Sequence, residues 1–75
     1  MLELTQQEAD TRTEIGTINN MTIRFFGEAI VDGCIDTVEL TEQEFEEQEG
    51  VIDYQRHTVF ANGVSQICLT KTAHY

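Results

Sequence analysis

The sequence predicts an α+β domain, in which an antiparallel sheet of four to five strands carries one short acidic helix at about residues 42–49. The sheet is indicated by two dipeptides, Asp32-Gly33 and Asn62-Gly63, which tolerate the positive φ angles of a two-residue type I′ hairpin turn. The helix is indicated by capping residues that lie between these two turns. Because no linker or repeat interrupts the 75 residues, we expect residues 1–75 to form a single domain.

The N-terminal region carries the weakest structural signals. Thr5 and Glu8 have the spacing of a capping box for a first helical turn, but few apolar residues nearby could be buried by a helix. Residues 1–12 are therefore expected to form either a first helical turn or a frayed terminus. Asn19-Asn20 is a weaker turn dipeptide, and it favours a short strand over residues 14–18 that pairs with the next strand.

Residues 21–32 show the clearest alternation of apolar and polar side chains, which predicts a half-buried strand. Gly27 within this strand indicates a bulge or a place where another group packs closely. A hairpin turn at Asp32-Gly33 sets Val31 opposite Cys34, Gly27 opposite Val38 and Phe25 opposite Leu40. In that register Asp36 lies opposite Ala29 on an otherwise apolar face, so it needs a sheet edge or an arginine partner, Arg24 or Arg56.

The segment TEQEFEEQEG, residues 41–50, carries a set of helix signals. Thr41 suits the N-cap position, and Glu44 completes a capping box with it. Leu40 and Phe45 have the spacing of a hydrophobic staple, and Gly50 suits the position after the helix. Phe45 is the only large apolar residue of this helix, so most of its surface should face water.

The turn at Asn62-Gly63 predicts a second hairpin at the C-terminal end of the chain. Its register sets His57 opposite Cys68, Val59 opposite Gln66 and Ala61 opposite Val64. One face is expected to join the core: Tyr54, Phe60, Ile67 and Leu69. The other face is the expected surface for a dimer or a partner: Val51, Val59, Val64 and Cys68.

The charge of the chain is strongly unbalanced, with 14 Asp and Glu against 4 Lys and Arg and a formal net charge of −10. Such a chain is not expected to bind nucleic acid directly, because phosphate binding needs a cationic surface. A field of this sign attracts basic surfaces, including those of nucleic-acid-binding proteins. The segment from residue 36 to residue 53 holds no Lys or Arg, and its carboxylates are the predicted partner-binding residues: Asp36, Glu39, Glu42, Glu44, Glu46, Glu47, Glu49 and Asp53.

Two interpretations of these carboxylates remain open. Like charges three or four residues apart on a helix each cost about 0.2–0.5 kcal/mol of stability. Soluble proteins usually intersperse both signs of charge on their surface, so a run of one sign suggests selection for a basic partner. The alternative is an acidic face that only maintains solubility.

No motif for catalysis, for a metal or for a cofactor is present, so the chain is not expected to be an enzyme. His57 and Cys68 provide two potential metal ligands, whereas a structural zinc site needs four. Cys34 and Cys68 lack the spacing of a disulfide framework, and the N-terminus has no basic and apolar leader. These features predict a reduced, cytoplasmic protein, and no apolar run is long enough for a membrane span.

In size, acidity and lack of catalytic motifs, the chain resembles the small acidic proteins that bacteriophages encode to inhibit host defences, such as anti-CRISPR proteins and other nucleic-acid mimics. This resemblance is to a functional class, and it assigns no role to individual residues. It implies a partner with a basic surface, such as a CRISPR effector or another nucleic-acid-binding protein. An inhibitor of this kind could also bind a protein–protein site and use its charge only for steering. The alternative from another class is a small structural or assembly protein, or a homo-oligomer such as a dimer joined through an exposed strand edge.

Overall fold

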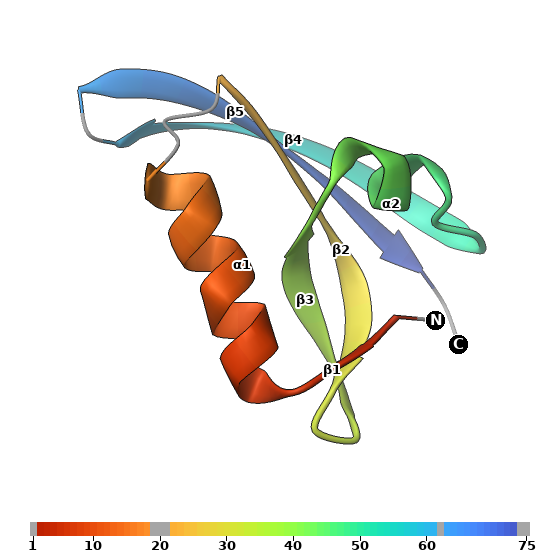
Figure 1. The fold of residues 1–75 in the computed structure, drawn as a ribbon. Helices are drawn as coiled ribbons and strands as arrows, with labels where there is room; N and C mark the ends of the chain where they lie inside the picture. Colours follow the sequence, from red (N-terminus) through yellow and green to blue (C-terminus); the bar gives the residue numbers. More distant parts are fainter. Residues whose placement is uncertain (1, 19–21, 62, 74–75) are drawn as a thin grey trace.

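A computed structural model describes residues 2–18, 22–61 and 63–73, without the side chains of residues 51, 52, 61 and 73. These residues form an α+β fold with a five-stranded mixed sheet and two helices, one of them short (Figure 1). No helix in the described ranges is long and apolar enough to cross a bilayer. The elements follow in the order β1 (Glu3–Leu4), α1 (Gln6–Ile18), β2 (Ile23–Val31), β3 (Cys34–Leu40), α2 (Glu42–Glu46), β4 (Val51–Ala61) and β5 (Val64–Ala73).

Strand β2 is the centre of the sheet. It pairs antiparallel with β3 over Phe25–Val31, parallel with β5 over Ile23–Phe26, and parallel with β1 at Ile30–Val31. Since a strand has two edges and β3 occupies one of them, β1 and β5 share the other. The prediction of a purely antiparallel sheet was therefore wrong. Turn dipeptides report only local hairpins, whereas these parallel pairs join strands that are distant in the chain.

Both predicted hairpins are confirmed in their register. In the first, Val31 pairs with Cys34 and Phe25 with Leu40, and Asp32 and Gly33 have φ angles of 48° and 85°, as a type I′ turn requires. In the second, Ala61 pairs with Val64, Val59 with Gln66 and His57 with Cys68. Asn62 of the second predicted turn lies outside the described residues, and so does the weaker turn dipeptide Asn19-Asn20.

Helix α1 decides between the helical turn and the frayed terminus that were left open for residues 1–12, and it replaces the short strand that was predicted for residues 14–18. The capping box at its start is formed, because the Thr5 N–H donates to Glu8 Oε1 (2.9 Å) and the Glu8 N–H donates to Thr5 Oγ1 (3.2 Å). Along its length the helix buries only Ala9 and Gly16. Such small residues leave no apolar periodicity to read, so the sequence pattern missed this helix, which is held by Ala9 in the core and by the ion pair of Arg12 with Glu44.

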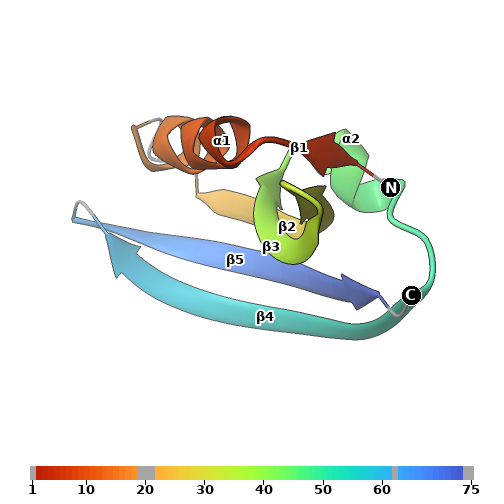
Figure 2. The same ribbon diagram turned by 90° about the horizontal axis from the view of Figure 1, so that it is seen from below.

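The core lies between the sheet and the two helices, which cover one of its faces (Figure 2). Gly27 is confirmed as a point of close packing, because a Cβ atom there would lie 2.4 Å from Gln48 Oε1 and 2.5 Å from Leu40 Cδ1. The buried cluster consists of Ala9, Ala29, Val31, Val38, Leu40 and Phe45, with Leu2, Leu4, Phe25 and Leu69 packed partly buried against it.

The expected core face of the last hairpin is only partly correct. Leu69 packs against the core, but Tyr54 and Phe60 are 55% and 76% exposed. The β4–β5 hairpin is long, and its turn end extends away from α2 (Figure 1), so a side chain as far along it as Phe60 is left in water. Cys34 is exposed beside the first turn, whereas Cys68, which was expected on the face for a dimer or a partner, is buried.

Candidate functional site

The acidic segment, residues 36–53, is built around α2, which starts with a complete capping box. The Glu44 N–H donates to Thr41 Oγ1 (3.2 Å), and the Thr41 N–H donates to Glu44 Oε1 (2.9 Å). Leu40 and Phe45, the two residues of the predicted staple, are both buried in the core cluster. The helix ends at Glu46 with Glu47 as its C-cap, three residues earlier than predicted, and Gly50 with φ 67° lies farther along the loop.

Phe45 anchors this helix to the sheet. Its ring centroid lies 5.0 Å from that of Phe25 and 6.1 Å from that of Tyr54. The Lys71 ammonium lies 4.2 Å from the centre of the Phe45 ring and donates a hydrogen bond to the Phe45 carbonyl (2.8 Å). Because the C-terminal carbonyls of a helix carry partial negative charge, Lys71 stabilises the end at which the glutamates are crowded.

A bidentate ion pair joins α1 to α2. Arg12 Nη1 lies 2.7 Å from Glu44 Oε1, and Arg12 Nη2 lies 3.1 Å from Glu44 Oε2. Arg12 also donates to the Glu39 carbonyl at 3.3 Å. The hydrogen bonds from Arg12, followed by that from the Thr41 backbone, lower the pKa of Glu44 to about 2. The same hydrogen bond raises the pKa of Arg12.

A second ion pair, between Arg24 on β2 and Glu39 on β3, is buried. Arg24 Nε donates to Glu39 Oε2 at 3.1 Å, and Nη2 contacts the other carboxylate oxygen. The hydrogen bond with Glu39 raises the pKa of Arg24. Gly16 of α1 makes room for this carboxylate, because a Cβ atom on Gly16 would lie 2.0 Å from Glu39 Oε2. Glu39 is 7% exposed, so it is not accessible to a partner.

The structure therefore divides the eight predicted carboxylates. Glu39 and Glu44 are paired with arginines of the same chain, Glu39 in a buried pair and Glu44 in a partly exposed one. Asp36 is exposed toward the turn end of β3, where it lies opposite Ala29 and accepts a hydrogen bond from the Thr37 N–H (2.8 Å). The remaining five are exposed and follow α2 into the start of β4; they are called the acidic surface below: Glu42, Glu46, Glu47, Glu49 and Asp53.

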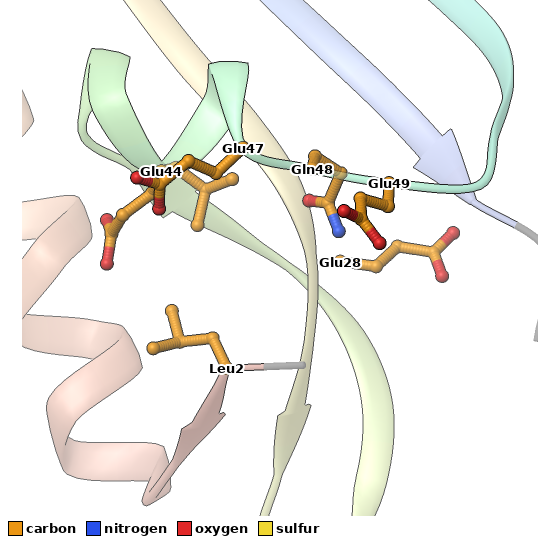
Figure 3. A pocket seen from close by; sticks show the side chains of 7 residues that line it. Leu2, Glu28, Glu44, Glu47, Gln48 and Glu49 are labelled. Atoms are coloured by element: carbon orange, nitrogen blue, oxygen red, sulfur yellow. The ribbon is translucent and has the colours of Figure 1, made fainter.

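A cavity of about 480 Å³ opens beside the acidic surface (Figure 3). Glu28 lines it from β2 and faces Gln48 and Glu49 across it, while Leu2 lies toward the end at which Glu44 is placed. Glu28 is not among the predicted site residues, because it belongs to a strand outside the acidic segment and alternation places it only on a polar face. The full lining consists of Leu2, Glu28, Leu40, Glu44, Glu47, Gln48 and Glu49.

This cavity can attract a cationic group that is carried on an apolar stem. The carboxylates provide negative charge, and Leu2 and Leu40 provide apolar contact. Among the described residues, no group of three or more His, Cys, Asp and Glu side chains is arranged to hold a metal ion. His57 lies opposite Cys68 as predicted, but its Nε2 atom is 3.2 Å from Gln55 Oε1 and its side chain is exposed. Cys34 and Cys68 are both free thiols.

Comparisons of the chain with protein-family models, with curated proteins and with solved structures find no match. The interpretation of the acidic surface therefore depends on its geometry and charge.

Proposed function

We propose that this chain is a small acidic binding protein that occupies the basic surface of a nucleic-acid-binding protein, in the manner of phage-encoded inhibitors such as anti-CRISPR proteins. The observation that carries the proposal is the charge left over after internal pairing. Arginines neutralise Glu39 and Glu44, whereas neither of the salt bridges in the described part of the chain involves a carboxylate of the acidic surface.

The acidic surface is supported by a helix whose position is fixed from several sides. The capping box holds the first turn of α2, Phe45 anchors its buried face, and Arg12 and Lys71 tie it to α1 and β5. Carboxylates on a fixed element can meet basic groups with little further loss of conformational entropy, which favours binding. A mobile acidic tail would lack these contacts and would lose more conformational entropy on binding.

The cavity adds a place for one basic side chain of the partner. Lysine and arginine combine an apolar stem with a charged head, and the cavity combines Leu2 and Leu40 with carboxylates of Glu28, Glu47 and Glu49. We expect the rim carboxylates to steer association and the cavity to hold the inserted side chain. Affinity should then fall as salt is added.

An assembly role is the second candidate. It is favoured by the exposed edge of β4, which from residue 54 to residue 61 is separate from the acidic surface.

The proposal is tested by affinity capture from bacterial lysate, followed by association kinetics with the captured protein. The proposal is supported if the captured protein binds nucleic acid and if this nucleic acid competes with the acidic protein for binding to the captured protein. A triple variant, Glu46→Gln, Glu47→Gln and Glu49→Gln, should associate several-fold more slowly and with a flatter dependence on salt.

The control variant carries the same change of net charge, from −10 to −7, at exposed positions on β1 and α1: Glu3→Gln, Asp10→Asn and Glu14→Gln. This variant should bind nearly as fast as the parent. If the two variants slow association equally, only overall charge matters and the acidic surface is not the binding site. If neither variant changes the rate, the carboxylates serve solubility and the proposal fails.

A further inference from the structure

Strand β4 forms an open edge of the sheet. Within the described part of the chain, the strand order β1-β2-β5-β4 places β4 at the end of the sheet, paired with β5 alone. In Figure 2, β4 forms the border of the molecule on the side away from both helices. Its side chains are exposed from residue 53 to residue 60.

The backbone groups that face this edge follow from one hydrogen bond. The Ile67 N–H donates to the Thr22 carbonyl of the segment leading into β2 (2.8 Å), so Ile67 faces β2 and its neighbours Gln66 and Cys68 face β4. Their partners in the register are Val59 and His57, which therefore face β5. Successive residues of a strand point their N–H and C=O groups to opposite edges. The backbone groups of Arg56, Thr58 and Phe60 therefore point to the open edge.

Apart from the charge of Arg56, this edge lacks the features by which proteins usually prevent strands from pairing. Residues 54–61 contain no proline, no lysine and no carboxylate. The register with β5 is continuous from Asp53 to Ala61, so no bulge twists this stretch away. Asp53 protects only the start of the edge, where its Oδ1 atom accepts the Tyr54 N–H (2.9 Å). Arg56 gives this stretch a positive charge in a chain whose net charge is −10.

We propose that β4 binds β4 of a second copy of this chain, in an antiparallel pair centred on Thr58. The three outward-facing residues are symmetric about Thr58, so a two-fold axis at this position pairs every one of them. Thr58 of one copy then lies opposite Thr58 of the other, and Arg56 of each copy lies opposite Phe60 of the other. Each such pair exchanges two hydrogen bonds, which gives about six across the interface.

The side chains favour a second copy over an unrelated strand. Phe60 and Val59 are 76% and 40% exposed in one copy, and the pair covers both. Arg56 meets the ring of Phe60, with which a guanidinium interacts favourably. Since no carboxylate lies between residues 54 and 61, two strongly acidic molecules can approach each other here. The proposal does not depend on the acidic surface, and it would extend the sheet through both protomers.

The experiment measures molar mass by light scattering over a range of protein concentrations, in about 0.5 M salt to screen the net charge. The parent should approach twice its 8.5 kDa mass as concentration rises. Thr58→Lys places two like charges opposite each other across the two-fold axis, so it should remain a monomer at concentrations where the parent is dimeric.

The matched control is Thr37→Lys, which makes the same change at an exposed position of β3, a strand that pairs only with β2 in the described part of the chain. This variant should dimerise like the parent, and circular dichroism should show that both variants are folded. In the parent, hydrogen exchange at the amides of Arg56, Thr58 and Phe60 should slow as concentration increases. A parent that stays monomeric, or a dimer that Thr37→Lys disrupts and Thr58→Lys does not, would overturn the proposal.

Discussion

Three of the four cationic side chains of this protein lie against its own acidic segment. Arg12 neutralises Glu44, Arg24 neutralises Glu39, and Lys71 caps the C-terminal end of α2. The buried pair of Arg24 with Glu39 is the most sensitive of these contacts, since removal of one partner would leave the other charge buried and unpaired. These residues hold the acidic segment in place and leave the acidic surface to external partners.

At the residue scale, the ion pair of Glu44 predicts a specific dependence on pH. The pKa of Glu44 is about 2 in the folded protein, below its ordinary value of 4.5. A carboxyl group whose pKa is lower in the folded than in the unfolded protein stabilises the folded state. This contribution is fully present above the pKa of the unfolded state and is lost as pH falls through the pKa of the folded state. The parent should therefore exceed Glu44→Gln in free energy of unfolding above pH 4.5, and this difference should shrink as the pH falls from 4.5 and vanish only below about pH 2.

Urea unfolding of the parent and Glu44→Gln at a series of pH values measures this difference. Glu42→Gln, at an exposed position of the same helix without an ion pair in the described structure, serves as the control. A difference that stays constant between pH 5 and pH 2 would show that Arg12 does not stabilise the charged form of Glu44.

At the scale of the element, α2 is too short to be stable by itself. Helices of fewer than about 12 residues are marginal in water, and α2 spans 5 residues, Glu42–Glu46. Its stability must come from the capping box, from Phe45 in the core and from the two cations that contact it. Most of these contacts reach α2 from other elements, so the helix depends on the fold around it.

The capping box of α2 should contribute to the stability of the folded protein. Thr41→Ala removes the hydroxyl that accepts the Glu44 N–H, and it should lower the free energy of unfolding by about 0.5–2 kcal/mol. The measurement is the urea midpoint at neutral pH. Thr11→Ala removes a hydroxyl from the exposed face of α1, where it donates to the Gln7 carbonyl, and should leave the midpoint unchanged or raise it slightly, because alanine has the higher helix propensity. Equal effects of the two substitutions would contradict a capping role for Thr41.

At the scale of the whole molecule, a small core has to hold together a strongly charged chain. A domain of 75 residues has a total stability of roughly 4–11 kcal/mol, so charge repulsion of a few tenths of a kcal/mol is significant. Several large apolar side chains remain exposed, among them Ile15, Ile18, Ile35 and Phe60. Association through a surface such as the β4 edge would compensate for a core of this size.

The glutamates of the acidic surface should be slightly unfavourable for folding. Because α2 ends at Glu46 and Lys71 compensates its C-terminal end, fewer like-charge contacts remain than a longer helix would contain. The triple variant, Glu46→Gln, Glu47→Gln and Glu49→Gln, should therefore gain less than about 0.5 kcal/mol in free energy of unfolding. Urea unfolding at low and high salt measures the gain, which should shrink with salt. A clear loss of stability would show that these carboxylates are structural.

The sequence by itself determined the features that depend on neighbouring residues. Asp32 and Gly33 set the register of the first hairpin, because only a few residues adopt positive φ readily. Thr41 and Glu44 marked the start of α2, because a capping box joins residues three apart. The alternation along β2 located the central strand of the sheet.

Only the tertiary structure decided which strands lie side by side and which charges are neutralised. The parallel pairs of β2 with β1 and β5, and the ion pairs of Arg12 and Arg24, join residues 15 or more positions apart in the chain. Helix α1 has too few apolar residues for a periodic pattern, and Glu28 reaches the acidic cavity only through the pairing of its strand. Short-range patterns carry no information on such contacts, because their free energy depends on the packing of the whole chain.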